Sequence, residues 1–182
     1  MRAAVMRNRR LVVDTLPDPE PGPGEVLVRT LACGICGSDL HVLAHVEAII
    51  EDARHSGSAL GAWMDPARDV VMGHEFCAEI VDYGPGAQRR LAPGTRVCSM
   101  PILPRAGGLR PSLGIHKELS LHFALGYTPD EFAATLRQIA EGGIPVEPLV
   151  TGKVGVEGVA ASFEALATPE RHAKILVEPW RS

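Results

Sequence analysis

The sequence predicts an α+β protein that is mainly β, and three observations support this prediction. Apolar and polar residues alternate in several short runs of the first hundred residues, which is typical of half-buried strands. Fifteen prolines and 19 glycines divide the chain into short segments, as expected for strands that are joined by turns. Apolar residues recur at helical spacing in only a few places, so we expect few helices.

The N-terminal strands are predicted from alternating runs. The segment MRAAVMRNRRLVVDTL carries an apolar run on each side of a polar turn at residues 7–10, and EVLVRTLAC alternates again after the loop PDPEPGPG. Further strands are expected in VVMGHEFCAEIVDYG and in TRVCSMPIL, which are separated by turn-forming glycine and proline. These runs predict a small antiparallel β unit.

Helices are predicted in three places. The first is expected from His41 to about Arg54, where Val42, Val46 and Ile49 recur at helical spacing. The second begins at a capping box of Thr128 and Glu131, with proline at the first helical position. We expect its buried face to consist of Phe132, Leu136 and Ile139. The third is marked by Val159, Phe163 and Leu166, and AKILVEP follows as a closing strand.

This pattern suggests three parts of the chain. Residues 1–103 form the first β part, with a helical insertion near 41–55. Residues 104–117, PRAGGLRPSLGIHK, show no periodicity and are expected to be a junction loop. Residues 118–182 are expected to contain a strand, two helices and a closing strand.

Composition excludes several functions. The chain of 182 residues has a net charge of −4 and only 4% aromatic residues, so we do not expect it to bind nucleic acid. It has no apolar run near the roughly 18 residues that a membrane span needs, and its N-terminus does not resemble a signal peptide. We therefore expect a cytoplasmic protein without membrane contact, with its cysteines reduced.

The segment LACGICGSDLH contains two cysteines, Cys33 and Cys36, in a CxxC spacing that suits either a redox dithiol or part of a metal site. Redox motifs of this kind lie between a strand and a helix of a βαβ unit, whereas this one follows antiparallel strands. A second CxxC that would complete a four-cysteine zinc site is absent from the sequence. We expect Cys33, Cys77 and Cys98 to be buried free cysteines.

Two motifs together, CGSDLH and VVMGHEFCAEIVDYGPG, resemble those of the zinc-dependent alcohol dehydrogenases of the medium-chain dehydrogenase/reductase superfamily. The segments TPDEFAATLRQIAEG and GVAASFEALATPERHAKILVEP resemble the C-terminal end of the same family. The resemblance implies a GroES-like antiparallel β-barrel with a few peripheral helices as the fold of the catalytic domain.

The resemblance also implies roles for individual residues. Cys36 and His74 would be catalytic zinc ligands, and Glu75 the acidic neighbour that can approach the metal. Thiolate and imidazole suit zinc, and a carboxylate on the second nitrogen of the histidine would orient its ring.

In the same resemblance that carboxylate is Asp39. Ser38 and His41 would carry the proton of an alcohol outward, while zinc makes the alcohol acidic. Of the residues implied as functional, we therefore expect catalytic roles for Ser38, His41 and Glu75.

The sequence departs from the family in an important way. No GxGxxG motif follows a strand, and no series of βα units predicts a dinucleotide fold, so we expect the nucleotide-binding domain to be absent. The third zinc ligand of relatives lies in that missing part. Zinc binding is then expected to be weak or absent unless a substitute ligand is recruited from Glu75, Cys98, Cys77 or His45. NAD(P) would bind only if another chain supplied the missing domain.

The sequence thus predicts a zinc-binding catalytic domain of an alcohol dehydrogenase-like oxidoreductase that is inactive in hydride transfer alone. Its substrate would be a small alcohol or carbonyl compound. Two alternatives stay open: a non-redox zinc lyase, hydratase or hydrolase, and a non-catalytic dimerising module. Residues 118–125, ELSLHFAL, would leave an uncovered strand edge, so we expect a homodimer through this segment.

Overall fold

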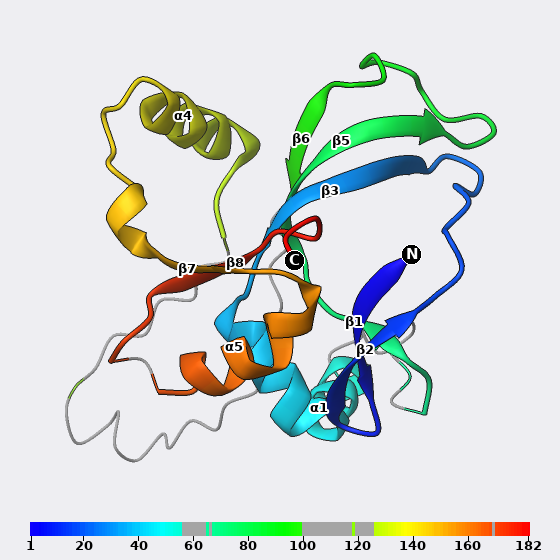
Figure 1. Cartoon of the computed structure of the whole chain (residues 1–182). Helices are drawn as coiled ribbons and strands as arrows, with labels where there is room; N and C mark the ends of the chain where they lie inside the picture. Colours follow the sequence, from blue (N-terminus) through cyan, green and yellow to red (C-terminus); the bar gives the residue numbers. More distant parts are fainter. Residues whose placement is uncertain (56–64, 66, 100–117, 119–125, 169) are drawn as a thin grey trace.

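The computed structural model describes residues 1–55, 65, 67–99, 118, 126–168 and 170–182. Its strands form two sheets, which are flanked by a few helices (Figure 1). The mainly β class with few helices that the sequence predicts is therefore confirmed.

The smaller sheet has three strands in the order β2-β1-β4. Strands β1 (Arg2–Arg7) and β2 (Arg10–Thr15) form the predicted hairpin, and the short β4 (Val70–Val71) pairs with the other edge of β1. Asn8 and Arg9 form the turn with φ angles of 49° and 60°. Two consecutive residues with positive φ match the right-handed twist of the flanking strands.

The larger sheet has five strands in the order β6-β5-β3-β8-β7. Its long central pair, β3 (Val26–Gly34) and β5 (Glu75–Tyr83), runs antiparallel. The remaining strands are β6 (Arg96–Ser99) beside β5, β8 (Lys174–Val177) beside β3, and β7 (Val150–Val154) at the far edge. The register places Gly34, the last residue of β3, opposite Glu75, the first residue of β5.

Two features differ from the predicted antiparallel barrel. Strands β7 and β8 pair in parallel, and the strands of the described residues do not close into a barrel. The parallel pairing follows from the connection, since α5 (Val159–Leu166) lies between the two strands and returns the chain to the same end of the sheet. Strand β7 was not predicted, because Gly152 interrupts its short alternating run.

Two apolar clusters hold the sheets and helices together. Helix α1 (Gly37–His55) begins before the predicted start at His41 and has non-helical angles at His45, φ −137° and ψ 31°. One cluster joins α1 to β1 and consists of Met6, Val42, Val46, Ile49, Ile50 and Ala53. The other joins the start of α1 to α5 and β8 and consists of Ile35, Val159, Phe163 and Ile175.

Helix α4 (Pro129–Ala140) has the predicted capping box between Thr128 and Glu131. Its predicted buried face is wrong, because no residue of α4 is buried and Leu136 is 41% exposed. The helix lies apart from α1 and α5 (Figure 1), so its apolar residues do not reach either cluster. Two short 3₁₀ helices, η1 (Glu147–Leu149) and η2 (Val156–Gly158), flank β7.

Several predictions fall outside the described residues. These are the junction loop at 104–117 and, apart from Glu118, the strand and dimer interface at 118–125. The division of the chain into three parts and the homodimer stay predictions. Among the helices of the described part, none is long and apolar enough to cross a membrane.

Candidate metal centre

Cys36 lies between strand β3 and helix α1, directly before the first helical residue, Gly37. The preceding residue, Ile35, is 6% exposed and belongs to the apolar cluster beneath α5. Its backbone N–H donates to the carbonyl oxygen of Ile175 at 3.1 Å. The backbone directly before Cys36 is therefore held in place both by the packing of Ile35 and by a hydrogen bond to β8.

His74 and Glu75 lie where the chain enters β5, and two glycines shape this entry. Gly73 has a φ of +106°, and a Cβ atom there would lie 2.8 Å from the Sγ atom of Cys33. A Cβ atom on Gly34, across the register, would lie 3.0 Å from Oε2 of Glu75. Glycine at these positions lets the two strands approach closely and leaves room for the Glu75 carboxylate.

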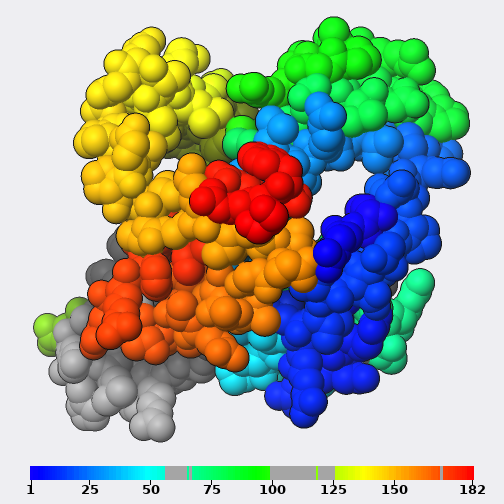
Figure 2. Space-filling model, in the orientation of Figure 1, coloured from blue at the N-terminus to red at the C-terminus, as the bar shows by residue number. Residues whose placement is uncertain are grey.

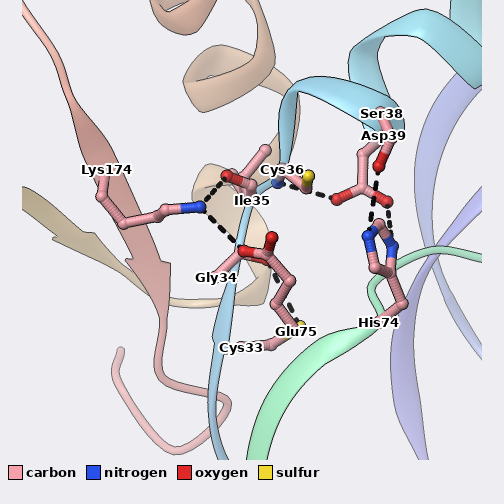
Figure 3. A network of polar contacts seen from close by, with 9 residues as sticks. All are labelled: Cys33, Gly34, Ile35, Cys36, Ser38, Asp39, His74, Glu75 and Lys174. Atoms are coloured by element: carbon pink, nitrogen blue, oxygen red, sulfur yellow. Dashed lines mark hydrogen bonds and ion pairs between the residues drawn. The ribbon is translucent and has the colours of Figure 1, made fainter. Parts of the chain in front are cut away.

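The side chains of Cys36, His74 and Glu75 converge, each offering one ligand atom, and these atoms all lie within 4.8 Å of one another. All three residues are half-buried. Figure 3 shows Cys36 approaching from the start of α1, Glu75 from the first residue of β5 and His74 from the segment directly before that strand. The three ligands that the sequence motifs predicted are thus brought together from two separate segments.

Asp39 connects two of these residues, and at 3% exposure it is one of the two buried polar residues among those described. Its carboxylate accepts from the backbone N–H of Cys36 at 2.9 Å and from Nδ1 of His74 at 3.0 Å. This hydrogen bond is the main cause that raises the pKa of His74 above its usual value, while burial opposes it. Asp39 therefore fixes both the position of Cys36 and the orientation of the His74 ring.

Ser38 contacts the other ring nitrogen, with its Oγ atom 3.1 Å from Nε2 of His74. Because the Asp39 carboxylate accepts from Nδ1–H, the neutral ring keeps a lone pair on Nε2, to which the Ser38 hydroxyl donates. The same lone pair is what a metal ion would use. Together with a thiolate and a carboxylate it forms a mixed sulfur, nitrogen and oxygen donor set, which fits zinc.

Lys174 was not predicted as part of the centre. Its ammonium group lies 2.7 Å from Oε2 of Glu75 and also donates to the carbonyl oxygen of Ile35 at 3.1 Å (Figure 3). It reaches the centre from β8, 99 positions away from Glu75 in the chain. The only signal for it in the sequence is a lysine at the start of an otherwise apolar closing strand.

Histidines 41 and 45 lie outside the group of three converging residues. Within the described part of the chain, the buried Nε2 atom of His41 has no hydrogen-bond partner. The rings of His41 and His45 are 4.9 Å apart between centroids. His41 follows Ser38 by three positions on α1, so the two residues project from the same face of the helix.

The other cysteines differ from the sequence expectation. Cys33 is half-buried rather than fully buried, and burial raises its pKa to about 11. Cys77 and Cys98 are exposed, which corrects the prediction that they are buried. The reason is the register of β5, in which the neighbouring Ala78 occupies the inward face.

One cavity of the described residues has a volume of about 680 Å³ and a mainly apolar lining. It reaches Asp39 and Gly73, whereas Cys36, His74 and Glu75 do not line it. Figure 2 shows an opening at the surface between the N-terminal strand, the C-terminal residues and the β3 region. The cavity therefore borders the candidate metal centre through Asp39 and Gly73 without including the three converging residues.

Comparison with known proteins gives a family match over this part of the chain. The family model of the alcohol dehydrogenase GroES-like domain matches residues 22–122, which include all three converging residues. A sorbitol dehydrogenase of Gallus gallus is 36% identical over 107 residues, covering 58% of this chain and 26% of that protein. The (R,R)-butanediol dehydrogenase of Bacillus subtilis (strain 168) is 34% identical over 109 residues, 59% of this chain and 30% of that protein. The chain thus spans less than a third of the length of these relatives.

Solved structures agree in fold. The 2R,3R-butanediol dehydrogenase from Bacillus subtilis aligns with a TM-score of 0.67 and 15% identity, over 98% of this chain and 99% of that one. The alcohol dehydrogenase TADH from Thermus sp. ATN1 aligns with a TM-score of 0.61 and 14% identity over the same shares of the two chains. Because its motif-bearing half matches the family model, the chain belongs to the alcohol dehydrogenase GroES-like domain family, as the resemblance predicted.

Proposed function

We propose that this chain is the zinc-binding catalytic part of an alcohol dehydrogenase-like oxidoreductase. The observation that carries the proposal is the convergence of Cys36, His74 and Glu75 within 4.8 Å, with Asp39 hydrogen-bonded to the first two. Catalytic zinc sites use about three protein ligands and leave a further position open for substrate. The donor set of this centre has that number and chemistry.

The residues around the centre would have different roles in metal binding, ring orientation and proton transfer. Cys36, His74 and Glu75 would hold zinc, which when bound supplies a Lewis acid that makes a substrate hydroxyl more acidic. Asp39 keeps Nε2 of His74 directed at the metal position. Ser38, whose Oγ atom is 3.1 Å from that nitrogen, would lie beside the metal position and take the proton of a substrate hydroxyl bound there.

The proton would then pass from Ser38 to His41. Supporting this step, His41 lies one helical turn beyond Ser38 and has an unpartnered Nε2 atom. A relay of this kind needs an acceptor that is not already saturated by hydrogen bonds, and His41 meets that requirement. We assign Ser38 and His41 as the proton path on these grounds.

We propose a small alcohol or carbonyl compound as substrate. The relatives are named for sorbitol, L-threonine and butanediol, which are all small hydroxylated molecules. A hydroxyl group of such a molecule is the part that a zinc centre with an open position would bind.

We also propose that the chain alone does not transfer hydride. In the described part, the parallel pairing is limited to β7 and β8, which is far less than a dinucleotide-binding fold contains. Hydride transfer requires the nicotinamide to be held at near-attack distance from the substrate. An NAD(P)-binding domain supplied by another chain would meet this requirement, and a cytoplasmic location stays a prediction.

Cobalt substitution tests the proposal directly. Cobalt(II) added to the metal-free protein should give a thiolate charge-transfer band and intense visible bands, and a small alcohol should shift the visible bands by entering the open position. The charge-transfer band should disappear in Cys36→Ser and persist in the matched control Cys98→Ser. Absence of that band in the wild type would overturn the metal centre, and bands insensitive to alcohols would overturn its catalytic use.

Nicotinamide reduction separates the redox function from a non-redox zinc enzyme. We expect the zinc-loaded chain to reduce neither NAD⁺ nor NADP⁺ with 2,3-butanediol or sorbitol when it is alone. Addition of a separately produced dinucleotide-binding domain of a relative should restore alcohol-dependent formation of reduced nicotinamide. Hydration or hydrolysis catalysed by the isolated zinc-loaded chain would contradict the oxidoreductase proposal.

A further inference from the structure

Two cysteines outside the metal centre face each other across β5 and β6. These strands run antiparallel, and their register places Cys77 directly opposite Cys98. A bulge fixes the register nearby: Gly94 N–H donates to Ile80 O at 2.8 Å, and Ile80 N–H donates to Thr95 O at 2.9 Å. Gly94 has a φ of +85°, the conformation that glycine adopts in a bulge of this type.

The bulge determines which kind of pair the cysteines form. Opposed residues in antiparallel strands alternate between hydrogen-bonded and non-hydrogen-bonded pairs, and Ile80 belongs to a hydrogen-bonded one. Along the register, the next pair, Glu79 and Arg96, is therefore non-hydrogen-bonded, and the pair of Ala78 and Val97 is hydrogen-bonded. Cys77 and Cys98 then form a non-hydrogen-bonded pair. Cα atoms of a non-bonded pair lie about 4.5 Å apart, at the short end of the roughly 4.4–6.8 Å that disulfides span.

The two thiols lie on the outward face of the sheet. Ala78 and Ile80 are 0% and 3% exposed and point inward, so Cys77 and its partner point the other way, and both cysteines are exposed. Partial shielding from water, followed by the hydrogen bond with the Cys77 thiol, raises the pKa of Cys98 to about 11.

We propose that Cys77 and Cys98 form a reversible cross-strand disulfide, a redox modification site separate from the metal centre. The oxidant would be a small-molecule disulfide of the glutathione class. A thiolate of the pair attacks one sulfur of that disulfide, whose other sulfur leaves as a thiolate, so a mixed disulfide forms. The second cysteine then displaces the remaining small thiol. The pair loses two protons and two electrons, and the small disulfide becomes two thiols.

The disulfide would join β5, which begins at the candidate metal centre, to the neighbouring strand β6. β5 begins at Glu75 of the metal centre, and β6 ends at Ser99. Closing the loop between Cys77 and Cys98 would restrain this hairpin without moving its backbone, because the register already holds the two residues opposite each other.

Peptide mapping after equilibration with glutathione tests the inference. The native, fully reduced protein would be incubated with mixtures of oxidised and reduced glutathione, quenched with acid and alkylated, and its peptides analysed by mass spectrometry. We expect one internal disulfide, between Cys77 and Cys98. The matched control Cys33→Ser should keep this link, whereas Cys98→Ser should carry only a mixed disulfide on Cys77.

The same equilibration in urea shows whether the native register is the cause. The native protein should reach half-oxidation at a glutathione ratio at least tenfold more reducing than the unfolded chain, because folding holds the thiols together. Two results would overturn the inference. One is that Cys77 and Cys98 of the native protein stay reduced, and so are alkylated, at a glutathione ratio that links them in urea. The other is a disulfide that joins either cysteine to Cys33 or Cys36.

Discussion

Lys174 forms an ion pair with Glu75, at 2.7 Å between Nζ and Oε2, and so joins the C-terminal strand to the candidate metal centre. The same ammonium group also binds the backbone carbonyl of Ile35, next to Cys36. The Glu75 carboxylate, which could bind a metal ion, is therefore already paired with the positively charged Lys174 side chain. The positive charge of Lys174 opposes the binding of a second cation at this place.

Replacing Lys174 by glutamine should therefore tighten metal binding. Removing one positive charge near a divalent ion lowers the Coulomb repulsion, and with partial solvent screening we expect zinc affinity to rise by about threefold to tenfold. Competition with a chromophoric chelator measures this change. Lys153→Gln is the matched control, since Lys153 of β7 pairs with Glu178, which directly follows β8. Weaker zinc binding in Lys174→Gln would show that Lys174 positions Glu75 rather than competing for it.

Replacing Asp39 by asparagine should weaken metal binding. The amide can still accept one hydrogen bond, but it cannot act as an anionic acceptor for both Cys36 N–H and His74 Nδ1–H. Loss of a carboxylate behind a ligating histidine typically costs about 10-fold to 100-fold in affinity. Asp52→Asn, an exposed residue of the same helix, is the control. Equal zinc dissociation constants for the two variants would contradict the role of Asp39.

Gly73 should be sensitive to substitution for two separate reasons. Alanine there meets both an unfavourable φ of +106° and a contact of 2.8 Å with the Cys33 sulfur. We expect Gly73→Ala to lower the free energy of unfolding by about 2–4 kcal/mol. Gly86 has a φ of +71°, but a Cβ atom added there would meet open space, so Gly86→Ala should cost only about 1 kcal/mol. Urea unfolding followed by circular dichroism compares them, and equal losses would exclude the steric contribution.

Arg7 should contribute to stability in mild acid but not in strong acid. Its hydrogen bonds lower the pKa of Asp14 and of Asp69 below the usual 3.8. A lowered folded-state pKa gives stability that is present above the unfolded pKa and is lost as the pH falls through the folded one. Arg7→Gln should therefore unfold at a higher pH than wild type, and the difference in stability should disappear below both pKa values. Arg10→Gln, on the same hairpin, should leave the acid midpoint unchanged.

Much of the candidate metal centre could be outlined from the sequence because its residues lie in two short motifs. Cys36, Ser38 and Asp39 fall within one turn of a helix start, and His74 and Glu75 are adjacent. Because the family's motifs are short and local, the resemblance was enough to imply this group. The β1–β2 hairpin and the α4 capping box are local in the same sense, and the structure confirms both.

Other features depend on long-range packing and could not be predicted. The contact of Lys174 with Glu75 requires β8 to lie beside β3, which no local pattern indicates. The parallel pairing of β7 with β8 depends on the path of α5. The exposure of Cys77 is different, because the alternation of β5 does indicate it: Glu75 and Glu79 share the face of Cys77, whereas Phe76, Ala78 and Ile80 share the other.

Zinc content is the most direct test of the central claim that Cys36, His74 and Glu75 form a metal centre. Inductively coupled plasma mass spectrometry would be applied to the wild type, Cys36→Ser, His74→Ala and the controls Cys98→Ser and His55→Ala, all reconstituted with zinc and desalted. We predict one zinc ion per chain in the wild type and both controls, and little or none in Cys36→Ser and His74→Ala. A wild type without zinc, or equal zinc in all five proteins, would contradict the claim.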